Sequence, residues 1–91
     1  MRILWDKAKR KSVLAKRKID FIHIHELLLL PYIEDRRKED PEQYRIIGFA
    51  RGTLTTFIVE YRRDAEGEIL WVVTAWKSTN WERKAYEQET N

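Results

Sequence analysis

The stretch I-L-W-V-V-T-A-W, residues 69–76, decides the fold class of this 91-residue chain. Seven of these eight residues are apolar, so a strand built from them has no polar face. Strands of this kind lie inside a sheet that is covered on both sides. Side chains alternate along a strand, which predicts Trp71 and Val73 on one face and Thr74 and Trp76 on the other. We therefore expect a central strand between two layers.

The residues before this strand supply further strands and the turns between them. Strand-like alternation or composition marks residues 2–5, 31–37, 44–48 and 54–61, and residues 38–41 form a charged turn. Arg51-Gly52 and the segment 64–67 have the composition of hairpin turns, because glycine accepts the positive φ that tight hairpins need. Consecutive hairpins give an antiparallel sheet, which we expect to hold about four strands.

Two segments near the N-terminus carry helix signals. Asp6 precedes residues 7–18, which contain no glycine or proline, and an aspartate side chain readily caps a helix N-terminus. Asp20 precedes a second segment, residues 21–29, whose apolar residues recur at helical spacing. Pro31 ends this segment, because proline cannot continue a helix.

A third helix closes the chain. Ser78 or Thr79 stands at its start, and Glu82 lies three residues after Thr79, which is the spacing of a capping box. The helix is expected to run to about Gln88. The sequence thus predicts one α+β domain over residues 1–91, an antiparallel sheet packed with two N-terminal helices and one C-terminal helix.

Positive charge gathers in the first predicted helix. Residues 7–18 hold seven of the 18 basic residues and no acidic residue, whereas the rest of the chain has 11 basic and 15 acidic side chains. The net charge of the whole chain is only +3. A local basic block is typical of a protein that binds a polyanion, most often a phosphate backbone. A solvated helix face on an ordinary domain would have the same composition.

Several classes of function lack the residues they need. The chain has no cysteine, which excludes disulfides, thiolate zinc sites and cysteine nucleophiles. His23 and His25 are the only histidines, and their spacing of two on a helix does not suit a shared metal, which needs four. At most one of them would face a site. No glycine-rich phosphate loop or nucleophile elbow is present, so we expect no metal and no cofactor.

The apolar runs Leu27–Leu30 and Ile69–Val73 are both far too short to cross a membrane. No export signal is visible, so we expect a cytoplasmic protein without a membrane partner. A basic helix beside a tryptophan-rich sheet suits single-stranded RNA, with cations on its backbone and aromatic rings on its bases. The alternative is that the four tryptophans belong to the core, as most of them must in so short a chain.

Short motifs follow one another in an ordered set. The first part of the chain holds Trp5-Asp6-x-x-Lys9, Val13, the run K-R-K-I-D-F at 16–21, Glu26 and Pro31. The middle holds Glu42, Tyr44, Gly48, Gly52 and Val59-x-Tyr61, and residues 71–86 read W-V-V-T-A-W-K-S-T-N-W-E-R-K-A-Y. In this order and at these spacings the chain resembles the BrnT family, the toxin half of a type II toxin–antitoxin system.

The resemblance implies a compact RelE-like fold and an endoribonuclease that needs neither metal nor other cofactor. It also implies a cognate DNA-binding antitoxin, encoded next to the toxin, that neutralises it in a heteromeric complex. Toxins of this kind activate an RNA 2′-OH towards the neighbouring phosphate. Their basic side chains stabilise the charge that builds in the transition state.

Some family positions hold other residues in this chain. Arg17 stands where the family has a histidine, and an arginine cannot act as a base at neutral pH. Gln43 stands at a family arginine, with Arg45 two residues further on the same strand face, and the closing strand has Trp71 and Trp76 where the family has arginines.

The resulting candidates are two overlapping sets. The catalytic set is Arg45, Lys16, Arg17 and Glu26, with the cations as charge stabilisers and Glu26 as a base. The RNA-binding set is Lys9, Lys16, Arg17 and Trp76. The sequence leaves open whether catalysis survives the substitutions. The alternatives are a catalytically degenerate RNA- or protein-binding module of the same fold, and a docking domain whose basic helix meets an acidic partner.

Overall fold

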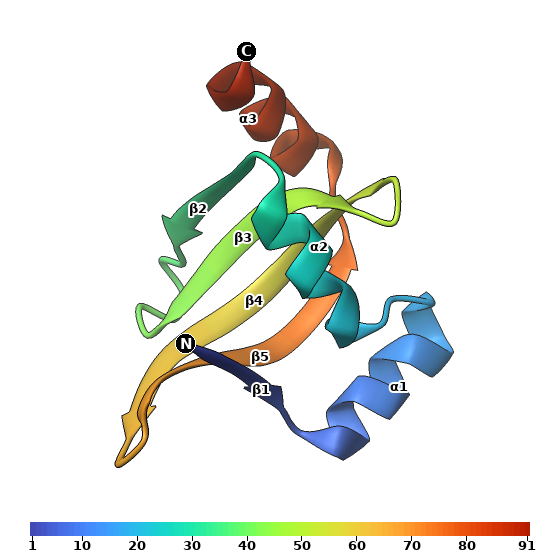
Figure 1. Ribbon diagram of the computed structural model, residues 1–91. Coiled ribbons are helices and arrows are strands. Elements are labelled where there is room, and N and C mark those ends of the chain that lie inside the picture. The colour runs from blue at the N-terminus through green and yellow to red at the C-terminus, as the bar shows by residue number, and fades with distance from the viewer.

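A computed structural model describes all of residues 1–91 as one five-stranded sheet with helices packed on it (Figure 1). The elements follow in the order β1 (Arg2–Trp5), α1 (Lys7–Arg17), the 3₁₀ helix η1 (Phe21–His23), α2 (Ile24–Leu29), β2 (Tyr32–Arg36), β3 (Gln43–Ala50), β4 (Thr53–Asp64), β5 (Gly67–Lys77) and α3 (Asn80–Thr90). The predicted α+β class is confirmed, and so is the order of its helices and strands.

The sheet itself differs from the prediction of about four antiparallel strands. It has five strands in the order β1-β5-β4-β3-β2, and β1 pairs with β5 in parallel. The other three pairings are antiparallel, so the sheet is mixed. The sequence of β1 does not indicate that its partner is β5, because more than 60 residues separate the two strands.

The predicted placement of Trp71 and Trp76 on opposite faces of the sheet is wrong, because β5 contains a β-bulge. Ile58 of β4 pairs with Thr74 and Val59 pairs with Val72, which leaves Val73 as an extra residue. An extra residue shifts the alternation of a strand by one. Trp71 and Trp76 therefore share one face of the sheet, whereas strict alternation would have put them on opposite faces.

The main core lies between the sheet and the N-terminal helices, on the side that we call the α2 face. Its buried members include Val13 of α1, Phe21 of η1 and Leu27 of α2, and the sheet contributes Phe57 and Val72. In Figure 1, α2 crosses this face while α1 lies towards the outer side of β5. The N-terminal helices thus cover the inner strands on one side only.

The opposite side, the α3 face, has a smaller core at one end. Tyr86 of α3 packs there with Ile47 and Leu54, and its hydroxyl donates to the Pro31 carbonyl at 2.9 Å. The predicted covering of β5 on both sides is therefore only partly correct. Trp71 is half-buried on this face, and the Arg62 guanidinium lies 4.4 Å from its ring centre.

The helix ends follow the signals in the sequence. Asp6 accepts from the Lys9 N–H, and Asp20 accepts from the Ile22 N–H at the start of η1. Thr79 and Glu82 form the predicted capping box of α3. Because these side chains satisfy backbone donors that have no partner within the helix, they fix where each helix begins.

Gly48 sets the closest approach between α2 and the sheet. A Cβ at this position would lie 2.9 Å from Leu27 Cγ and 3.0 Å from Tyr32 Cβ. We predict that Gly48→Ala lowers the free energy of unfolding by about 1–3 kcal/mol, because the added methyl overpacks this contact. Urea denaturation followed by fluorescence measures this loss.

The matched test is a double-mutant cycle with Leu27→Ala, which removes the side chain that the new methyl meets. Leu27→Ala alone should lower the free energy of unfolding by about 2–5 kcal/mol. The double variant should lose less than the sum of the two single losses. Additive losses would show that contact with Leu27 is not the cause.

Candidate functional site

A cavity of about 500 Å³ opens on the α2 face, where the C-terminus of α1 and η1 meet the ends of three strands. Basic side chains and hydroxyls dominate its lining, which consists of Arg17, Lys18, Ile19, His23, Ala50, Arg51, Thr53, Thr55 and Lys77. None of these residues is acidic. Four lysine or arginine side chains and one histidine thus line the same cavity, and no carboxylate lines it.

Backbone turns bring the cations to this cavity. Lys18 ends α1 in a left-handed conformation, with φ of 60°, and the chain then reverses into η1, which carries His23. Arg51 and Gly52 both have positive φ, as the tip of a two-residue hairpin requires, and they carry β3 into β4 beside the cavity. Lys77 stands at the end of β5, paired with Thr55 of β4.

Arg17 is held at the cavity wall by the outer edge of β5. Strand β1 ends opposite Val72, so no strand pairs with this edge further along. The Arg17 guanidinium donates there to the Ala75 carbonyl at 2.9 Å and to the Thr74 hydroxyl at 3.2 Å. A charged group fixed in this way is preorganised for an anion.

Glu26 has a positioning role beside the cavity. Its carboxylate accepts from the backbone N–H of Arg51 at 2.7 Å, which ties the β3–β4 turn to α2. Glu26 does not line the cavity. Glu26, the predicted base, therefore holds the β3–β4 turn in place from outside the cavity.

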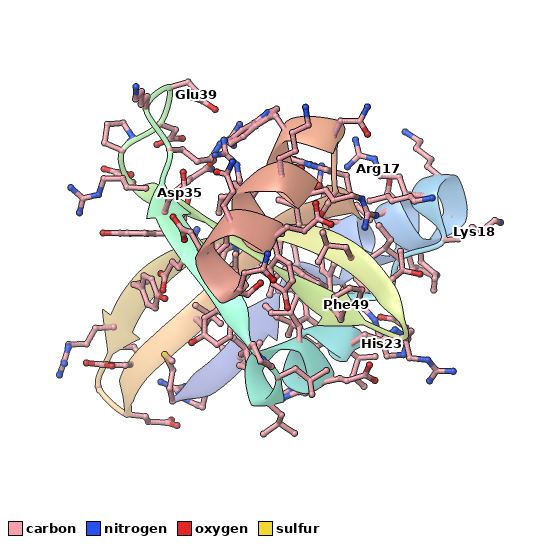
Figure 2. The ribbon with its side chains drawn as sticks, turned by 90° about the horizontal axis from the view of Figure 1, so that it is seen from above. Arg17, Lys18, His23, Asp35, Glu39 and Phe49 are labelled. Atoms are coloured by element: carbon pink, nitrogen blue, oxygen red, sulfur yellow. The ribbon has the colours of Figure 1, made fainter.

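The chemistry of this lining fits an oxoanion. Lysine and arginine supply charge and donors, the threonine hydroxyls supply neutral donors, and no carboxylate among the lining residues competes with a phosphate. Figure 2 shows Arg17, Lys18 and His23 at one end of the molecule and Asp35 and Glu39 at the other. No group of three His, Cys, Asp or Glu side chains has a metal-binding arrangement.

The structure brings only part of the predicted site together. Arg17 lines the cavity, but Lys9 and Lys16 do not. At about 100° per residue along a helix, these two lysines lie on one side of the inward-facing Val13 and Arg17 lies on the other. They are exposed, so they add positive charge to the surface of α1 rather than to the cavity.

Arg45 lies on the α3 face, across the sheet from the cavity. It is 9% exposed and forms ion pairs with Asp35 at 3.0 Å, Glu39 at 3.7 Å and Glu82 at 3.4 Å. Its guanidinium also lies 4.9 Å from the ring centre of Trp81. With three carboxylates around it, Arg45 joins α3 to the sheet, and this member of the predicted catalytic set lies away from Arg17 and the cavity.

Trp76, predicted to bind RNA together with basic residues of α1, also lies on the α3 face and does not line the cavity. Its side chain is half-buried, and the indole N–H donates to Glu82 at 3.0 Å. Glu82, 2% exposed, also accepts from Thr56 at 2.9 Å and from the Thr79 backbone N–H at 2.9 Å. Trp76 therefore packs against α3, which agrees with the alternative in which the tryptophans have a structural role.

Sequence reasoning left out most of the cavity. Lys18, Arg51, Lys77, Thr53 and Thr55 were not candidates, and the choice between His23 and His25 was open. His23 lines the cavity while His25 is exposed on α2. Lys18 at the end of the basic block was the one available signal, because the others lie near strand ends or in a turn, in distant parts of the chain.

Comparison with protein-family models and with curated protein sequences finds no match for this chain. None of the helices has the length and apolar character that a membrane crossing requires.

Asp20 links α1 to η1 beside the cavity. The Arg10 guanidinium donates to both of its carboxylate oxygens, at 2.7 and 3.0 Å, and this hydrogen bonding holds the pKa of Asp20 below its usual range. A lowered native pKa stabilises the fold above the unfolded-state pKa of about 3.9, and the contribution is lost as pH falls through the native value.

We predict that Arg10→Gln makes the melting temperature less dependent on pH below about 5, because the unfolded and native pKa values of Asp20 then move closer together. Thermal melts between pH 2 and 7 measure this dependence. Lys11→Gln, at an exposed position of the same helix, is the control and should keep the wild-type dependence. Identical acid profiles for both variants would contradict the assignment.

The Arg45–Glu82 pair should behave as a structural unit. We predict that Arg45→Met lowers the free energy of unfolding by about 3–5 kcal/mol, because Glu82 then remains as an uncompensated buried charge. Adding Glu82→Gln removes that charge and should restore part of the loss in urea denaturation. If the double variant loses the sum of the two single effects, the pair does not act as a unit.

Proposed function

We propose that this chain is a BrnT-like toxin that cleaves RNA without a metal, in a RelE-like fold, and that a cognate antitoxin neutralises it. The observation that carries the proposal is the cavity, in which Arg17, Lys18, Arg51 and Lys77 meet with no acidic lining residue. The ordered motifs that resemble the family support the choice of RNA as the polyanion. The proposed setting is the bacterial cytoplasm, and the proposed antitoxin is a DNA-binding protein encoded adjacently.

The proposed role of the cavity is to hold one phosphodiester of a single-stranded RNA. Cationic side chains offset the charge that develops on the phosphate oxygens as the 2′-OH attacks. Holding the phosphate also aligns the attacking and leaving oxygens, which lowers the entropic part of the barrier. Arg17, fixed by its bonds to β5, suits this role because it needs no reorganisation during the reaction.

A second candidate is a module that binds RNA through the same cavity but does not cleave it. The observation that favours it is the set of substitutions at the family positions. Arg17 replaces the family histidine, and Trp71 and Trp76, which replace arginines, lie on the face of the sheet that is remote from the cavity. Binding then depends on the same cations, and only the chemical step is lost.

We predict that the double variant Arg51→Asn, Lys77→Gln weakens binding to a single-stranded oligoribonucleotide. The slope of log affinity against log salt should fall by about 0.7 for each phosphate contact that is lost. Both side chains are exposed, and asparagine tolerates the positive φ of residue 51, so the fold should be retained. Fluorescence anisotropy over a series of salt concentrations measures the slope.

Lys84→Gln is the matched control, because Lys84 is an exposed lysine of α3 outside the cavity. Induction of the wild type in bacteria should arrest growth and fragment RNA. Binding without fragmentation would favour the second candidate. If the wild type binds no RNA, or if the control changes the slope as much as the double variant, the proposed role of the cavity is wrong.

A further inference from the structure

His23 is the only imidazole among the lining residues of the cavity, and imidazole is the side chain that enzymes use most often as a general acid or base. It is half-buried at the end of η1, where its backbone N–H donates to the Asp20 carbonyl at 3.1 Å. The lysine and arginine side chains of the cavity supply positive charge that can stabilise a developing anion. The cavity thus combines fixed charge with a single group suited to proton transfer.

The charged groups around His23 come from every element that borders the cavity. Arg17 and Lys18 belong to the end of α1, Arg51 to the β3–β4 turn and Lys77 to β5. The two nearby carboxylates are already engaged. Asp20 is bonded to Arg10, and Glu26 is bonded to the backbone of the β3–β4 turn. No free carboxylate of this group therefore competes with His23 for the role of base.

We propose that His23 is a catalytic residue of this chain, the base that removes the proton from the RNA 2′-OH; this inference rests on the proposed ribonuclease function. The assignment differs from the sequence-based candidates, in which the family histidine position is Arg17 and the base was Glu26. It places proton transfer on η1 and charge stabilisation on α1, the β3–β4 turn and β5.

Water is the only other molecule that takes part in the cleavage step. The neutral imidazole of His23 takes the 2′-OH proton, the 2′ oxygen forms a bond to phosphorus, and the bond from phosphorus to the 5′ oxygen breaks. Water entering from the open side of the cavity protonates the leaving 5′ oxygen, and the hydroxide formed then takes the proton from His23. The products are a 2′,3′-cyclic phosphate and a 5′-hydroxyl end.

The experiment compares His23→Asn with His25→Asn in the 91-residue chain, using a labelled oligoribonucleotide. His25 is two residues away and exposed, which makes it the control for loss of a histidine. We expect His23→Asn to reduce the single-turnover cleavage rate by about 100-fold or more, as for loss of a general base. RNA affinity and melting temperature should stay near the wild-type values, because asparagine keeps a polar group of similar size at the rim.

The pH profile separates a base from a residue that only shapes the cavity. Because a general base must be unprotonated to act, the wild-type cleavage rate should rise with pH and then level off, whereas the residual rate of His23→Asn should lack this rise. A substrate with a 2′-deoxy nucleotide at the cleaved position should bind but remain intact. The wild-type products should carry the cyclic phosphate.

The outcomes distinguish the inference from the function on which it rests. If the wild type cleaves RNA and His23→Asn cleaves at the same rate with the same pH profile, the assignment of His23 is wrong and the ribonuclease stands. If the wild type does not cleave RNA under any condition, the ribonuclease function fails and the assignment of His23 fails with it. Equal loss of activity in His25→Asn would also overturn the assignment.

Discussion

Parallel pairing of β1 with the outer edge of β5 is the constraint on which the rest of the structure depends. The four paired positions, from Arg2 with Ile69 to Trp5 with Val72, join the start of the chain to its last strand. Because β1 stops there, α1 begins at Lys7 and runs beside the unpaired remainder of β5. The end of α1 then lies next to the end of the sheet, and the cavity forms between them.

Three arginines show how the role of a charged side chain depends on burial and on nearby carboxylates. Arg45 is almost fully buried and has three carboxylates within ion-pair distance, so its charge is used to attach α3 to the sheet. Arg17 and Arg51 are exposed and line a cavity without acidic residues. Charge that is neutralised within the protein contributes to specific packing, whereas unneutralised charge is available to an external anion.

The parts of the fold that could be predicted from the sequence are those with local causes. Asp6, Asp20 and the pair of Thr79 and Glu82 each cap a helix through contacts within three residues, so their signals are readable in short segments. The parallel pairing of β1 and the bulge at Val73 have no such local cause. Both features depend on which distant strand pairs with β5. The alternation of apolar residues along a strand does not specify that partner.

The same reasoning accounts for the candidate site. Arg17 was a candidate because it belongs to the basic block and stands where the resemblance to the BrnT family has a histidine. Arg51 and Lys77 reach the cavity only because a hairpin tip and a strand end meet α1 in space, and each looks like an ordinary surface residue in its own segment. Arg45 was placed wrongly because its strand face is covered by α3, whose carboxylate at Glu82 lies far along the chain.

The bond from Arg17 to the Ala75 carbonyl also bears on self-association. Beyond Val72 the outer edge of β5 has no strand partner, and an open edge of this kind is a template for pairing with another chain. A guanidinium that occupies one of its carbonyls, with Lys77 at the strand end, places positive charge where a second strand would have to dock. We therefore expect the Arg17 side chain, which lines the cavity, also to oppose strand-to-strand aggregation.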